Sequence, residues 1–138
     1  MANDTGNGAS YTFSGVTVAA RRITVNEQTL GNNPIDVLSD TTWIAKQPHD
    51  LGEQGTVAIE HLFDPSDTDQ VPALGTQGTL TITFDQLVTS NTAANITGSA
   101  HISAVKPPDF ANNETLVGTI TFQWDGSGTN GPVYSAEA

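Results

Sequence analysis

The 138-residue chain contains no cysteine. It can therefore form no disulfide bond, it offers no thiolate nucleophile, and it cannot build a zinc site from sulfur ligands. Three histidines, His49, His61 and His101, are the remaining candidates for a base or a zinc ligand, and none has the His-x-x-x-His spacing. We interpret each as an ordinary strand or loop residue, and the sequence predicts no metal and no cofactor.

Basic residues are scarce: four lysines and arginines face fifteen acidic residues, for a formal charge of −11. Proteins that grip nucleic acid through its phosphates use lysine and arginine to displace counterions, so this mode of binding is not expected. An acidic surface repels DNA instead. Two interpretations remain open: the charge keeps the protein soluble, or it forms walls past which a polyanion slides.

Long apolar runs are also missing, since no window approaches about 18 apolar residues, the length that spans a membrane. Residues 1–8 lack the basic start and apolar run of a signal peptide. The sequence therefore predicts synthesis in the cytoplasm and no membrane segment.

Catalytic motifs are not found either. There is no Gly-x-Ser-x-Gly elbow and no phosphate-binding glycine loop after a strand. Asp64, Asp67 and Asp69 lack the spacing and the final glutamate of a calcium loop, which favours a capped turn. The sequence points to no enzyme.

What the chain does contain is a series of strand-like runs. Residues 78–84 and 116–124 alternate apolar and polar side chains with the period of two of a half-buried strand. Their apolar faces consist of Leu80, Ile82 and Phe84 in the first run and Leu116, Ile120, Phe122 and Trp124 in the second. The opposite faces are rich in threonine.

Other segments complete a mainly β fold. Residues 96–105 predict a strand of small residues, with Ile96, Ala100, Ile102 and Ala104 on one side. Residues 56–63 predict another strand, and residues 11–25 one long or two consecutive strands. Ser66 is a good helix cap, and Pro72 limits any helix that it begins to a short one. We expect a β-sandwich or barrel-like fold with at most one short α-helix.

The predicted organisation is a flexible arm at residues 1–10, one domain at residues 11–126 and a flexible tail at residues 127–138. Between turn signals, residues 31–55 form a long excursion from the sheet that contains Trp43. Excursions of this length are usually functional or disordered. Trp43 is either buried late in folding or held for another chain.

Arg21 and Arg22 carry half of the positive charge, and as adjacent strand residues they point to opposite faces. In one interpretation both are solvated strand residues. In the sharper hypothesis one of them pairs with an acid on a neighbouring subunit.

The order of these elements resembles that of the major tail (tail tube) proteins of long-tailed bacteriophages, over most of residues 11–126. The closing pair of strands, ITGSAHISAVKPPD followed by LVGTITFQWDG, is its most characteristic part. The resemblance implies a β-sandwich or barrel-like subunit with a short flanking helix and long inter-subunit loops. Such subunits form rings, typically sixfold, that stack into a hollow tube through which DNA leaves the capsid. Pro72 departs from the family's usual helix.

The same resemblance implies a structural virion protein located in the tail. Its partners would be copies of itself, within and between rings, and terminator, tape measure and distal tail proteins, while DNA passes through without being specifically bound. The candidates for the lumen or for contacts between subunits are Asp36, Asp40, Glu53, Glu60, Arg21, Arg22 and Trp43.

Two alternatives remain open. A capsid decoration protein or other virion adaptor would share the small, acidic β composition, but would bind shells and stay monomeric or trimeric alone. A carbohydrate-binding sandwich would use Trp43 and Trp124 as platforms, although only 7% of the residues are aromatic.

Overall fold

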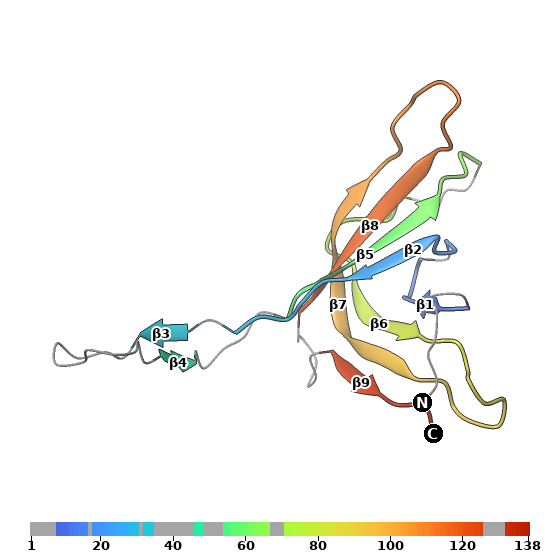
Figure 1. The fold of residues 1–138 in the computed structure, drawn as a ribbon. Helices are drawn as coiled ribbons and strands as arrows, with labels where there is room; N and C mark the ends of the chain where they lie inside the picture. The colour runs from blue at the N-terminus through green and yellow to red at the C-terminus, as the bar shows by residue number, and fades with distance from the viewer. Residues whose placement is uncertain are drawn as a thin grey trace.

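The computed structural model describes residues 8–16, 18–30, 32–34, 46–48, 54–66, 71–125 and 132–138. All regular structure in these ranges is β (Figure 1). The strands are β1 (Ser10–Thr12), β2 (Arg22–Val25), β3 (Asn32–Pro34), β4 (Lys46–Pro48), β5 (Thr56–Leu62), β6 (Gln77–Thr83), β7 (Asn95–Lys106), β8 (Val117–Trp124) and β9 (Val133–Ser135). The prediction of a mainly β fold is confirmed.

Seven strands form one antiparallel sheet in the order β1-β6-β7-β8-β5-β2, with β9 also paired to β7. The sheet curls into a half-barrel (Figure 1). Strand β7 is twelve residues long and bonds to three strands. Because β6 pairs with residues 95–101 along one edge, β8 and β9 share the other edge at residues 100–106 and 95–97.

The apolar face of this sheet holds the core. In β5 and β8 every second residue is buried, as the alternating sequence predicts. The buried apolar side chains are Phe13, Val16, Val18, Val57, Ile59, Leu80, Ile82, Ala100, Ile102, Ile120, Phe122 and Trp124. Phe122 lies inside this cluster, with its ring centroid 4.8 Å from that of Phe13. Burial of this face is the main source of stability.

A tight turn separates the first two strands. Val16 donates its amide to the Phe13 carbonyl (3.1 Å), and Gly15 in this turn has φ of 85°, a conformation that glycine adopts without strain. The Tyr11 hydroxyl donates to the Val18 carbonyl (2.7 Å), and burial raises the pKa of Tyr11 to about 12. The region predicted as one or two strands is thus two, and they lie at opposite ends of the strand order.

Strand β7 departs from the predicted alternation near its end. Ala100 and Ile102 are buried as expected, but the register with β8 shifts between Ile102 and Ala104. This β-bulge places Val105 against the core and leaves Ala104 exposed. The predicted core position of Ala104 is therefore wrong, because one extra residue reverses every side chain that follows it.

Phe84 also differs from its predicted place on the apolar face of residues 78–84. It follows the last residue of β6, is 37% exposed, and meets the Tyr134 ring edge-on at a centroid distance of 6.2 Å. Its partner belongs to β9, a strand that the sequence prediction did not include.

Within the described ranges no α-helix occurs. Ser66, the predicted helix cap, instead donates both its amide (3.0 Å) and its hydroxyl (2.7 Å) to the Asp64 carboxylate. Residues 67–70, which complete the predicted short helix, lie outside the described residues. No described helix is long and apolar enough to cross a membrane.

Strands β3 and β4 fall inside the predicted excursion of residues 31–55. They pair antiparallel, with Asn33 opposite Gln47, and form a separate two-stranded sheet. Figure 1 shows this pair well away from the seven-stranded sheet, beyond the ends of β2 and β5. The excursion therefore leaves the sheet as predicted.

One glycine in β8 makes room for a buried histidine. His61, 1% exposed, lies opposite Gly118 and donates from Nδ1 to the Leu62 carbonyl (3.4 Å). A Cβ atom at position 118 would lie 2.9 Å from both Cε1 and Nε2 of His61. Real Cβ atoms essentially never approach another atom so closely, so a side chain at position 118 would force the His61 ring to move.

We therefore expect Gly118→Ala to lower the free energy of unfolding by on the order of 1 kcal/mol, since overpacking outweighs the gain in strand propensity. Urea denaturation measures this loss. In a His61→Ala background the same substitution should be neutral or stabilising, because the ring is gone. An equal cost in both backgrounds would show that the two residues are not coupled.

Candidate assembly surface

The face of the sheet opposite the core is covered with hydroxyl groups. Because side chains alternate along strands, the residues between the core positions all point to this second face. We call it the hydroxyl face and define it by Thr56, Thr79, Thr81, Thr83, Thr97, Ser99, Thr119 and Thr121. These residues occupy β5, β8, β7 and β6, the four central strands of the sheet.

Polar groups on and beside this face bond to one another. The hydroxyls of Thr81 and Thr97, paired across β6 and β7, lie 2.9 Å apart. Gln123 Nε2 donates to the carbonyls of Gly55 (2.8 Å) and Trp124 (2.9 Å). Some of the polar groups on this face are therefore already hydrogen-bonded within the sheet. Such groups offer fewer free donors and acceptors to a passing molecule.

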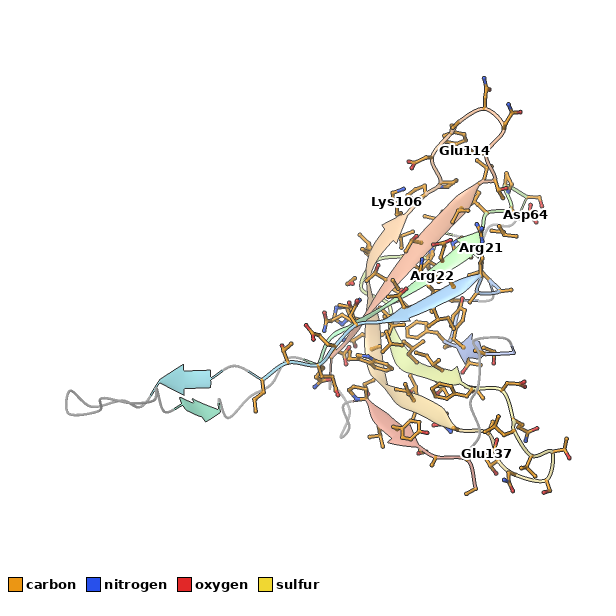
Figure 2. The ribbon with its side chains drawn as sticks, viewed as in Figure 1. Arg21, Arg22, Asp64, Lys106, Glu114 and Glu137 are labelled. Atoms are coloured by element: carbon orange, nitrogen blue, oxygen red, sulfur yellow. The ribbon has the colours of Figure 1, made fainter. Side chains whose placement is uncertain are left out.

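Few charged side chains lie on or beside this face in the described part of the chain. Glu60 of β5 stands opposite Arg22 of β2, and Arg21 Nη1 lies 3.8 Å from Glu60 Oε1. Figure 2 shows Arg21 and Arg22 near each other on this part of the sheet. Lys106 is the last residue of β7 and pairs with Asp109 at 3.3 Å. His101, near the middle of β7, contacts Asp125 at 3.0 Å. The central threonine rows therefore form a largely uncharged surface in the described part of the chain.

The structure brings together three of the predicted site residues: Glu60, Arg21 and Arg22 meet where β2 pairs with β5. The Arg21 side chain is more than half exposed, so its ion pair contributes at most about 1 kcal/mol. Asp36, Asp40, Trp43 and Glu53 lie outside the described residues.

Sequence reasoning did not identify Glu137. Its Oε1 accepts the Leu87 amide (2.7 Å) and its Oε2 accepts Asn91 Nδ2 (3.3 Å). Ala138 and Thr92 exchange two backbone hydrogen bonds beside it, at 2.7 and 3.3 Å. The C-terminal segment therefore fastens the loop between β6 and β7. No local pattern signals this contact, because the partners are about fifty positions apart.

Among the described residues no group of three histidine or carboxylate side chains is placed to hold a metal ion. The hydrogen bond from the Ser66 hydroxyl lowers the pKa of Asp64 most, and the hydrogen bond from the Ser66 amide lowers it further. Asp67 and Asp69, the other two acids of the loosely calcium-like triplet, lie outside the described residues. The geometry at Asp64 is that of the predicted capped turn.

No protein-family model matches the chain, and no curated protein does. Solved structures do match. A chain in the structure of the PVC sheath/tube terminator of an extracellular contractile injection system, in its extended state, aligns with TM-score 0.74 and 12% identity over 99% of each chain. A chain of the anti-feeding prophage baseplate aligns with TM-score 0.71 and 12% identity over 99% of this chain and 98% of that one.

Hcp1 from Flavobacterium johnsoniae is less similar, with TM-score 0.50 and 16% identity over 83% of this chain and 88% of that chain. Together these matches confirm the resemblance to tail tube proteins at the level of the fold. The structures named above come from contractile injection systems and related proteins, not specifically from long-tailed bacteriophages. The resemblance in fold therefore extends beyond the phage tail proteins that the sequence suggested.

The contacts of Glu137 predict that the order of the loop between β6 and β7 depends on pH. Its pKa is held below the ordinary 4.5, chiefly by the Leu87 amide. The stabilisation of the loop is therefore complete above pH 4.5 and is lost as the pH falls through the lowered folded value. We expect the exchange protection of the Leu87 amide, corrected for intrinsic rates, to fall over that acidic range.

The control is Glu137→Gln, which still offers an oxygen to Leu87 but does not titrate. Its protection factor should stay flat over the same range. A wild-type profile in this variant would show that a different group controls the loop.

Proposed function

We propose that this protein is a structural subunit of a tail tube, which assembles with copies of itself into stacked rings around a channel and performs no catalysis. The observation that carries the proposal is the fold match to a chain of a sheath/tube terminator structure over 99% of both chains. A match over nearly the whole length of both chains supports a shared architecture rather than one shared motif.

The hydroxyl face is suited to line such a channel. A wall that must let a polymer pass should neither bind it through unlike charge nor hold it through apolar contact. Threonine hydroxyls are neutral and hydrated, and few charged residues interrupt their rows in the described part of the chain. The chain's net charge of −11 adds a repulsion toward polyanions. DNA, the cargo that the sequence resemblance implies, would pass without being held.

The excursion at residues 31–55 supplies contacts between subunits in this proposal. Its pair β3–β4 forms a sheet of its own, away from the seven-stranded sheet (Figure 1). Trp43, Asp36, Asp40 and Glu53 belong to the same excursion and are the candidates for contacts between subunits or with the lumen, together with Glu60, Arg21 and Arg22. Rings are expected to be sixfold, with terminator, tape measure and distal tail proteins as further partners in the particle.

Electron microscopy of the purified protein at high concentration tests the proposal. We expect rings and stacked tubes with an open channel. A monodisperse particle that neither forms rings nor polymerises would refute it, and so would turnover of a substrate.

Replacing residues 31–53 with a short glycine-serine linker tests the excursion. Asn26 and Thr56 are hydrogen-bonded through their side chains (2.7 Å), so the sheet ends of the excursion lie close together and a short linker can join them. The expected product is a folded monomer, with the wild-type circular dichroism spectrum, that forms no tubes. Tubes of normal appearance would exclude a role of the excursion in assembly.

A further inference from the structure

The excursion leaves the sheet between the end of β2 and the start of β5. The chain goes out through Asn26 and Glu27 and returns through Gly55 into Thr56, and we call these four residues the root of the excursion. Asn26 donates its amide to the Thr56 carbonyl (2.9 Å) and its Nδ2 to the Thr56 hydroxyl (2.7 Å). The outgoing and returning segments are therefore bonded to each other where they leave the sheet.

Strand β8 holds the root from its other side. The Gly55 carbonyl accepts the Trp124 amide (3.3 Å) and Gln123 Nε2 (2.8 Å). A carbonyl oxygen has two lone pairs, so these two donors can fill its hydrogen-bonding capacity. Asp125, the next residue, donates its amide to the Ser99 carbonyl of β7 (3.0 Å). The root is thus joined through the end of β8 to the centre of the sheet.

Gly55 occupies a place with no room for a side chain. Its φ is 83°, in the left-handed region that other residues rarely adopt. A Cβ atom at this position would lie 2.6 Å from the Glu27 carbonyl oxygen and 3.2 Å from that of Asn26. Both are backbone atoms, so neither can rotate away as a side chain would. A side chain at position 55 would therefore push the outgoing segment away from the returning one.

Two other glycines share this conformation but not this contact. Gly15 and Gly75 have φ of 85° and 82°, and a Cβ atom at either position would meet nothing within 4 Å. Alanine at any of the three positions adopts a strained backbone conformation. Only at position 55 would it also force the two segments of the excursion apart. Gly15 and Gly75 are therefore matched controls for the strain alone.

We propose that Gly55 is a positioning residue, which fixes the direction of the excursion so that it reaches a second copy of this chain. A segment already held in its bound direction loses less entropy on association than one that swings freely. A small shift at the root also becomes a large displacement at the β3–β4 pair, because this pair lies well away from the sheet (Figure 1). The inference rests on the proposed role of the excursion in assembly and adds the residue that directs it.

Alanine substitutions at the three glycines test this role. We expect Gly55→Ala to fold, with the wild-type circular dichroism spectrum, but to lower the association constant for tube formation by about tenfold or more, since its excursion is misdirected. Gly15→Ala and Gly75→Ala should form tubes as the wild type does. Sedimentation and electron microscopy, carried out well below the melting temperature of each variant, measure the difference.

A distance measurement tests the direction of the excursion without assembly. Because the chain lacks cysteine, Leu30→Cys and Ala104→Cys can carry two spin labels. Leu30 is 49% exposed and follows the root on the outgoing segment, and Ala104 is exposed on β7. In the dilute, unassembled protein, Gly55→Ala should shift or broaden the distribution of distances between the labels. Gly15→Ala and Gly75→Ala should leave this distribution unchanged.

A second variant loosens the root without any clash. Gln123→Leu removes the side-chain donor to the Gly55 carbonyl, and it should broaden the distance distribution and reduce tube formation. Its control is Thr81→Val, which removes a hydroxyl bonded to Thr97 on the hydroxyl face, away from the root. This control should change neither result. The pair decides the question if Gly55→Ala does not fold.

The outcomes separate this inference from the tube function. Normal tubes from Gly55→Ala, an unchanged distance distribution, or an equal loss of tubes in the two control glycine variants would overturn the positioning role and leave the tube function standing. If Gly55→Ala does not fold, normal tubes from Gln123→Leu have the same meaning. Failure of the wild-type protein to form rings or tubes overturns the tube function itself.

Discussion

The antiparallel pairing of β7 with its neighbours is the constraint on which the rest of the structure depends. Since β7 binds β6 on one edge and both β8 and β9 on the other, its register determines which side chains of these strands face the core. Ala100 and Ile102 then meet the apolar rows of β8 and β6, and the alternate residues form the hydroxyl face. A slip of one residue would exchange the two faces, as the bulge near Ser103 does locally for Ala104 and Val105.

Closure of the core comes from the N-terminal part of the chain. The half-barrel has an apolar concave side, and the segment after β1 covers it with Phe13, Val16 and Val18 before the chain enters β2. The two strands at the ends of the path, β1 and β2, are three and four residues long. Short edge strands leave few unpaired backbone groups, and assembly with other copies is one way of covering those that remain.

The proposed function assigns a use to each part of the surface. The threonine rows offer a neutral wall, the β3–β4 pair extends beyond the sheet, and the two ends of β7 carry apolar side chains that the subunit itself does not bury. Glu137 accepts the Leu87 amide and so orders an exposed loop. In the proposed function this order would favour stacking on another copy, because a pre-ordered contact loses less entropy on association.

The amino-acid sequence by itself determined the β class and the strands predicted at residues 56–63, 78–84 and 116–124, which the structure has at 56–62, 77–83 and 117–124. It did so because alternation over seven or eight residues is a local signal of burial on one side. It also located the excursion at residues 31–55 between turn signals. Only the tertiary structure decided the separation of β1 from β2, the bulge in β7, the pairing of β9 and the contact of Glu137 with Leu87. Each of these depends on partners distant in the chain, and a short strand such as β9 gains its stability from the edge it meets rather than from its own three residues.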